Sequence, residues 1–185
     1  MAGSSSSQSE AWRTRRRNQR TEDWVRRELV KPEYERGGYN VKVETNEWAW
    51  VKAYATQGVT DAQKALDKLG FPTVPPADLA CSRAGTSLGV EIKFFKESAK
   101  KKYRFYEGID EVAALLLQPY DKVVLWHVFD ESFETATVER DVARHIERLL
   151  KGTVPIGYEC RQIASEKLRT VLHVEAPDNP FKHSN

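Results

Sequence analysis

The chain has 185 residues with a formal net charge of +2, and 40% of the residues are hydrophobic. That length predicts one domain with a full-sized core rather than two domains. No apolar run approaches the roughly 18 residues that a membrane helix needs, so we expect no membrane partner. The Ser-rich opening lacks the hydrophobic stretch of a secretion signal, which predicts a cytoplasmic protein with its two cysteines reduced.

The first segment, residues 1–20, shows no apolar periodicity and is predicted to be a flexible tail. Within it, residues 12–20 read WRTRRRNQR, with several arginines and no acid. Clustered cations can displace counterions from a phosphate backbone, although such a run can equally be solvated surface. A second basic stretch, KFFKESAKKKYR, follows at residues 93–104.

A single domain is expected over residues 21–176. Thr21 is suited to cap a helix that runs to about Lys31, where Pro32 ends or bends it. After the glycine pair at 37–38, residues 39–44 alternate as in a strand, whereas WAWVKAYA at 48–55 fits either a strand or a helix. A short helix is predicted from Thr60 to Lys68, before a proline-rich stretch.

The second half of the domain alternates strands and helices. Two strands are expected at 77–83 and 88–95, joined by a four-residue turn at 84–87. The remaining predicted elements are a helix at 106–118, a buried central strand at 122–129, a helix at 138–150, and strands at 157–163 and 168–175. A polar tail covers 177–185. This order predicts an α/β fold in which helices flank a mixed central β-sheet.

Two charged residues occupy the otherwise hydrophobic strand at 88–95. Glu91 and Lys93 point to the same face because side chains alternate along a strand. A four-residue turn would pair Asp78 with Lys93 across the hairpin and place its side chain on that face too. A register slip of one residue would send Asp78 to the opposite face.

Carboxylates that converge in this way repel each other unless a cation lies between them. Oxygen ligands without nearby histidines suit Mg²⁺ or Mn²⁺ rather than zinc. A neighbouring ammonium group can orient a water or stabilise a charged phosphate. The same three residues can also form a salt-bridge cluster on an exposed sheet face, so geometry alone leaves both interpretations open.

The pattern Pro76-Ala77-Asp78, followed after twelve residues by Glu91-Ile92-Lys93, resembles the PD-(D/E)XK nuclease superfamily, which includes restriction endonucleases and archaeal resolvases. The resemblance implies a restriction-endonuclease-like core of α-β-β-β-α-β order, which residues 21–129 match. Ala77 between the proline and the aspartate is a departure at a position that varies in that family.

The resemblance also implies roles. Asp78 and Glu91 would bind Mg²⁺ with the backbone carbonyl of Ile92 as a third ligand, and Lys93 would attend the attacking water. Family members commonly add a glutamate from the first helix, for which Glu22 and Glu28 are the candidates. We prefer Glu28, which falls within the apolar arc of the helix at 100° per residue, although an ion pair with a neighbouring arginine explains it nearly as well.

These expectations point to a Mg²⁺-dependent deoxyribonuclease, an endonuclease that hydrolyses phosphodiester bonds with a metal-activated water. Cutting both strands would favour a homodimer. The alternatives are a non-catalytic nucleic-acid-binding or scaffolding protein on the same fold, and a nuclease acting on RNA. His127, in the central strand, is interpreted as a core histidine. The candidate DNA contacts are Arg15, Arg16, Arg17, Lys96, Lys100, Lys101, Lys102 and Arg104.

Overall fold

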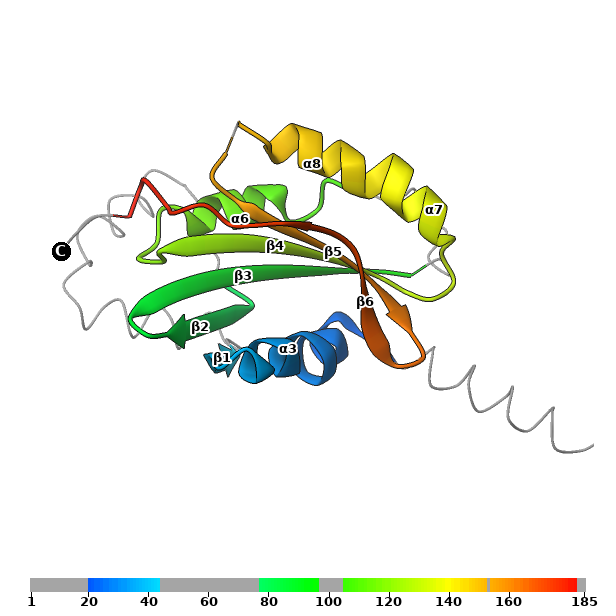
Figure 1. Cartoon of the computed structure of the whole chain (residues 1–185), viewed down its shortest axis with the longest axis horizontal. Helices are drawn as coiled ribbons and strands as arrows, with labels where there is room; N and C mark the ends of the chain where they lie inside the picture. Colours follow the sequence, from blue (N-terminus) through cyan, green and yellow to red (C-terminus); the bar gives the residue numbers. More distant parts are fainter. Residues whose placement is uncertain (1–19, 44–76, 97–104, 153, 183–185) are drawn as a thin grey trace, which may run out of the picture.

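The computed structural model describes residues 20–43, 77–96, 105–152 and 154–182. The elements predicted at 48–55 and 60–68, and most of the N-terminal tail, lie outside the described residues. The strands form one six-stranded sheet in chain order, β1-β2-β3-β4-β5-β6 (Figure 1). They are β1 (Asn40–Val43), β2 (Leu79–Arg83), β3 (Thr86–Phe95), β4 (Lys122–Phe129), β5 (Gly157–Ala164) and β6 (Lys167–Val174).

The sheet is mixed, as the element order predicted. The three central strands β3, β4 and β5 run parallel, whereas each outer pair is antiparallel. Each parallel step is made through a helix that returns over the sheet, which is the connection that parallel strands require. Among the described helices, none combines the length and apolarity needed to cross a bilayer. The α/β class with a mixed sheet is therefore confirmed.

Helices cover both faces of the sheet (Figure 1). One face carries a continuous helix built from α2 (Glu22–Trp24), a widened segment η1 (Val25–Val30) and α3 (Lys31–Arg36). The other face carries α6 (Ile109–Leu115) and a second continuous helix. That helix consists of α7 (Thr135–Thr137), η2 (Val138–Ala143) and α8 (Arg144–Leu150). A separate apolar core fills each of the two layers.

The first helix begins as predicted but does not end at Pro32. The Thr21 hydroxyl accepts a hydrogen bond of 3.1 Å from the Trp24 backbone N–H, so the expected cap is confirmed. The helix then continues to Arg36. In its widened part, the Lys31 N–H donates to the Arg26 carbonyl five residues earlier. The widened segment ends at Val30, two residues before Pro32, whose ring would collide with a carbonyl in a regular helix.

The β2–β3 hairpin has a two-residue turn instead of the predicted four-residue turn. Ala84 and Gly85 take φ values of 49° and 82°, and this pair of positive φ angles matches the natural twist of the flanking strands. Ala80 consequently pairs with Gly89 rather than with Glu91. The error in the predicted register is two residues, and a shift by an even number leaves every side chain on its predicted face.

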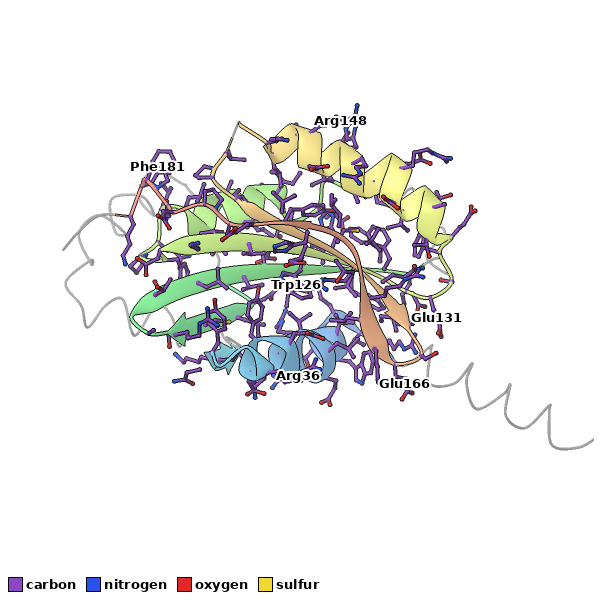
Figure 2. All side chains as sticks on the ribbon, viewed as in Figure 1. Arg36, Trp126, Glu131, Arg148, Glu166 and Phe181 are labelled. Carbon is purple, nitrogen blue, oxygen red and sulfur yellow. The ribbon has the colours of Figure 1, made fainter. Side chains whose placement is uncertain are left out.

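Strand β4 lies at the centre of the sheet, with the bounds expected from the sequence. All of its residues except Lys122 are buried, so both faces are covered as predicted. Trp126 faces the first helix, where its indole N–H donates to the Tyr34 hydroxyl of α3 at 2.9 Å (Figure 2). Leu125 and Phe129 lie in the core on the side of α6 and α8.

Residues within both predicted tails contact the domain. Asn179 is buried, and its amide donates to the carbonyls of Leu116 and Tyr120. Arg20 is buried too and pairs with Asp130. Both cysteines, Cys81 and Cys160, are free and buried.

Candidate functional site

The candidate site lies at the point where β3 runs on beyond its neighbour β2. Leu79 and Val90 form the last pair between these strands, while β3 continues to Phe95. Beyond this pair, carboxylates bind the backbone of β3. Asp78 Oδ2 accepts a 2.7 Å hydrogen bond from the Ile92 N–H, and Glu22 Oε2 accepts one of 3.3 Å from the Phe94 N–H. Two acidic side chains therefore line this open strand edge.

The carbonyl of Ile92 lies along the same edge as the Asp78 carboxylate. In a strand, the N–H and C=O of one residue point toward the same neighbouring strand. Because the Ile92 N–H points to Asp78, its carbonyl is directed to that side as well. The site thus offers a backbone oxygen next to a half-buried carboxylate.

Arg26 of the first helix forms an ion pair with Asp78 and lies 3.9 Å from Glu22 Oε1. Burial raises the pKa of Asp78 to about 6, although Arg26 and the Ile92 N–H act in the opposite direction. The guanidinium is not fully satisfied, since its buried Nε has no hydrogen-bond partner among the described residues. Arg26 therefore has one buried N–H without a hydrogen-bond partner among the described residues.

Glu91 and Lys93 lie on the α6 side of β3. The Lys93 ammonium is 2.9 Å from Glu91 Oε1, and it also forms an ion pair with Glu111 of α6. Burial, the hydrogen bond with Glu111 and the charge of Asp78 raise the pKa of Glu91 to about 9. Glu91 thus carries a proton at neutral pH unless a further cation approaches.

The charges of Lys93 and Glu111 complete this cluster. Burial lowers the pKa of Lys93, but the carboxyl groups of Glu91 and Glu111 outweigh burial and leave it raised. The pKa of Glu111 is lowered, first by its hydrogen bond with Glu91 and then by Lys93. The pKa values of the two carboxyl groups are thus shifted in opposite directions, that of Glu91 upward and that of Glu111 downward.

The structure brings together Asp78, Glu91 and Lys93, the three residues singled out by the motif. The charge of Asp78 influences Glu91, and the charge of Lys93 influences Asp78. Glu22 joins them through the Phe94 N–H.

Our preference for Glu28 is not supported, because its side chain is exposed. The projection at 100° per residue assumed a regular helix, and the widened turn at Val25–Val30 changes that angle.

Arg26 and Glu111 belong to the site and were not predicted. Arg26 follows Glu22 by four residues, the spacing that places two side chains on one helix face, and this signal was present in the sequence. Nothing in the sequence indicates that Glu111 reaches Lys93, because the contact depends on where α6 lies on the sheet.

Of the candidate DNA contacts, only Lys96 lies within the described residues. Its ammonium lies 5.5 Å from the centre of the Phe94 ring, and burial lowers its pKa. His127, by contrast, is a core histidine as predicted. Its ring nitrogens contact the Glu107 carbonyl and the Tyr158 hydroxyl, each at 3.1 Å.

The carboxylate and carbonyl oxygens of this cluster have the negative charge and the ligand type that a divalent cation binds. Within the described ranges, no group of three or more His, Cys, Asp or Glu side chains is already arranged to hold a metal ion. The cluster nevertheless contains more acids than bases. Four carboxyl groups pair with two cationic side chains, so two negative charges are in excess when all six groups are ionised. The acids are Glu22, Asp78, Glu91 and Glu111, and the bases are Arg26 and Lys93. Carboxylate and carbonyl oxygens are the ligands that Mg²⁺ and Mn²⁺ prefer.

Comparison with known proteins finds no family model, curated protein or solved structure that matches the chain. Any assignment to a nuclease family therefore depends on the motif and on the geometry of the site, and it is a proposal.

Proposed function

We propose that this chain is a Mg²⁺- or Mn²⁺-dependent deoxyribonuclease with a restriction-endonuclease-like core. The observation that carries the proposal is the convergence of Asp78, Glu91 and Lys93 at the open end of the β2–β3 hairpin. A helix with an acidic side chain, a motif hairpin, a second helix and a buried parallel strand surround them in the order expected for that core. Acidic groups combined with an amine suit phosphoryl chemistry better than acyl chemistry.

The cation would be held by Asp78, Glu91 and the Ile92 carbonyl, with support from Glu22. A bound divalent ion lowers the pKa of a water molecule that it binds and stabilises negative charge on phosphate oxygens. Lys93, held beside Glu91, orients the attacking water and stabilises charge that develops on the phosphate.

We favour DNA as the substrate and endonucleolytic cleavage as the reaction. Lys96, directly after β3, and the basic residues that follow it in the sequence suit contacts with the phosphate backbone. Cleavage of both strands would be served by a homodimer with two-fold symmetry. RNA presents the same phosphodiester, so an RNA substrate belongs in the same test.

The test is a panel of labelled linear, branched and single-stranded DNAs, and matched RNAs, incubated with Mg²⁺, Mn²⁺ or a chelator. We expect DNA cleavage that the chelator abolishes. Asp78→Ala, Glu91→Ala and Lys93→Ala should each reduce the rate by about 10²–10³-fold, as for the loss of one electrostatic group from such a site. The exposed Glu28→Ala is the matched control and should cut like the parent. If the three site variants cut as fast as the parent, the assignment is wrong.

A second candidate function is a non-catalytic nucleic-acid-binding or scaffolding protein. It is favoured by one observation: Arg26 and Lys93 already form ion pairs with Asp78 and Glu91. In that case the cluster is a structural ion network. Calorimetric titration with Mn²⁺, with and without DNA, separates the two functions, because a structural network would bind no divalent ion in either titration.

A further inference from the structure

The segment that begins α6 is built closely around the Lys93 side chain. Glu111, in the first turn of α6, forms an ion pair with the Lys93 ammonium. Gly108, directly before α6, packs against the methylene chain of the same lysine. One short stretch of chain therefore contacts both the charged end and the apolar stem of Lys93.

Two independent constraints call for glycine at position 108. Its φ of 85° lies in the left-handed region that other residues rarely adopt. A Cβ atom there would lie 2.9 Å from Lys93 Cγ, closer than real contacts allow, and 3.0 Å from both Lys93 Cε and Leu125 Cδ1. Any larger residue would therefore press on the lysine stem and on the Leu125 side chain.

The contribution of Glu111 to stability is expected to be small. Its side chain is 39% exposed, and ion pairs that face solvent contribute little to folding. Its effect on Lys93 is larger, because a free lysine side chain samples many rotamers whereas this one is held from two sides. The Lys93 side chain is only 16% exposed and its amine is kept at Glu91.

We propose that Gly108 and Glu111 are positioning residues for Lys93, which hold its amine beside Glu91 where a phosphate would react. This inference rests on the proposed nuclease function. It predicts that the two residues affect the chemical step rather than substrate binding or folding.

The first test compares Glu111→Gln with Asp110→Asn. Both substitutions remove one acidic charge from the first turn of α6, but Asp110 is exposed and its side chain is not part of the site. We expect Glu111→Gln to lower kcat for DNA cleavage by about tenfold or more at unchanged KM, because a small displacement of a catalytic group greatly reduces the rate of the chemical step. Asp110→Asn should retain the parental kcat.

The second test compares Gly108→Ala with Gly152→Ala. Gly152 has a φ of 74° and an open surrounding, so alanine strains the backbone there without touching any neighbour. Both variants should lose a few degrees in Tm from backbone strain, and Gly108→Ala should lose more because its Cβ also presses on Lys93 and Leu125. Only Gly108→Ala should also lower kcat, and equal kcat values in the two variants would contradict the proposal.

A third measurement tests whether the Lys93 ammonium group is held in place, and it does not depend on catalytic activity. A held lysine ammonium gives a sharp ¹H–¹⁵Nζ signal in NMR spectra, and the signal of Lys93 is assigned by its loss in Lys93→Arg. We expect this signal in the parent and in Asp110→Asn, and its broadening in Glu111→Gln and Gly108→Ala.

The outcomes separate this inference from the proposed function. If Lys93→Ala abolishes cleavage while Glu111→Gln retains both kcat and the Lys93 signal, the positioning role is wrong and the nuclease assignment stands. If the parent cuts no nucleic acid, the nuclease assignment fails together with the catalytic role of the two residues. The Lys93 signal then still shows whether they hold the amine. Should Glu111→Gln lower Tm markedly, Glu111→Asp replaces it, because the shorter carboxylate keeps the charge but draws back from Lys93.

Discussion

Asp78 accepts a 2.7 Å hydrogen bond from the backbone N–H of Ile92, the residue between Glu91 and Lys93. Asp78 lies one position before β2, so its side chain replaces the strand that would otherwise pair with this part of β3. The aspartate is thereby fixed beside the other two motif residues by the backbone of β3. This contact explains how a short pattern in the sequence becomes a shared site.

The acidic residue supplied by the first helix is expected to be Glu22. Glu22→Gln should weaken Mn²⁺ binding by about tenfold or more, in the range seen when groups that support a metal site are removed. Glu28→Gln, in the same helix but exposed, should bind Mn²⁺ like the parent. Isothermal titration calorimetry measures both. The reverse ranking would restore Glu28 as the contributing residue.

Arg26 is expected to compete with a divalent cation for Asp78. Arg26→Met removes the competing charge while keeping most of the apolar side chain, so the dissociation constant for Mn²⁺ should fall by about tenfold, which corresponds to roughly 1.4 kcal/mol. Arg27→Met is the control, because Arg27 is exposed and pairs with Asp23. Unchanged Mn²⁺ affinity in Arg26→Met would show that the ion pair with Asp78 does not block the cation.

The buried ion pair between Arg20 and Asp130 is expected to stabilise the fold strongly. Their atoms are 2.7 Å apart, and their side chains are 7% and 3% exposed. Arg20→Ala leaves a buried carboxylate unpaired and should reduce the free energy of unfolding by about 3–5 kcal/mol. Arg140→Ala, which breaks an exposed pair with Asp141, should leave it nearly unchanged. Urea denaturation compares the two, and equal losses would contradict the expectation.

His127 should make the fold sensitive to acid. Burial lowers its pKa from 6.5 to about 4, so the unfolded chain takes up a proton before the folded protein does. Its contribution to stability is therefore complete above pH 6.5 and is lost as the pH falls toward 4, by up to about 3 kcal/mol. His127→Gln cannot titrate, so unfolding curves across this range should show a shallower pH dependence than in the parent. An identical dependence in the two proteins would refute the role of His127.

Much of the local structure could be predicted from the sequence. The cap at Thr21, the bounds of β4 and the alternation that places Glu91 and Lys93 on one face all follow from nearest neighbours along the chain. The shared face of Asp78 was also predicted, even though the turn was wrong. An error of two residues in register preserves the side on which each residue points.

Other features were decided by the tertiary structure. The widened turn that brings Glu22 rather than Glu28 to the site arises where the helix packs against the sheet and meets Pro32. The ion pairs Arg26–Asp78 and Glu111–Lys93 join residues that are far apart in the chain, so no local sequence pattern predicts them. Hydrophobic periodicity and capping depend on a few neighbouring residues, whereas the partner of a charged side chain depends on which elements fold next to it.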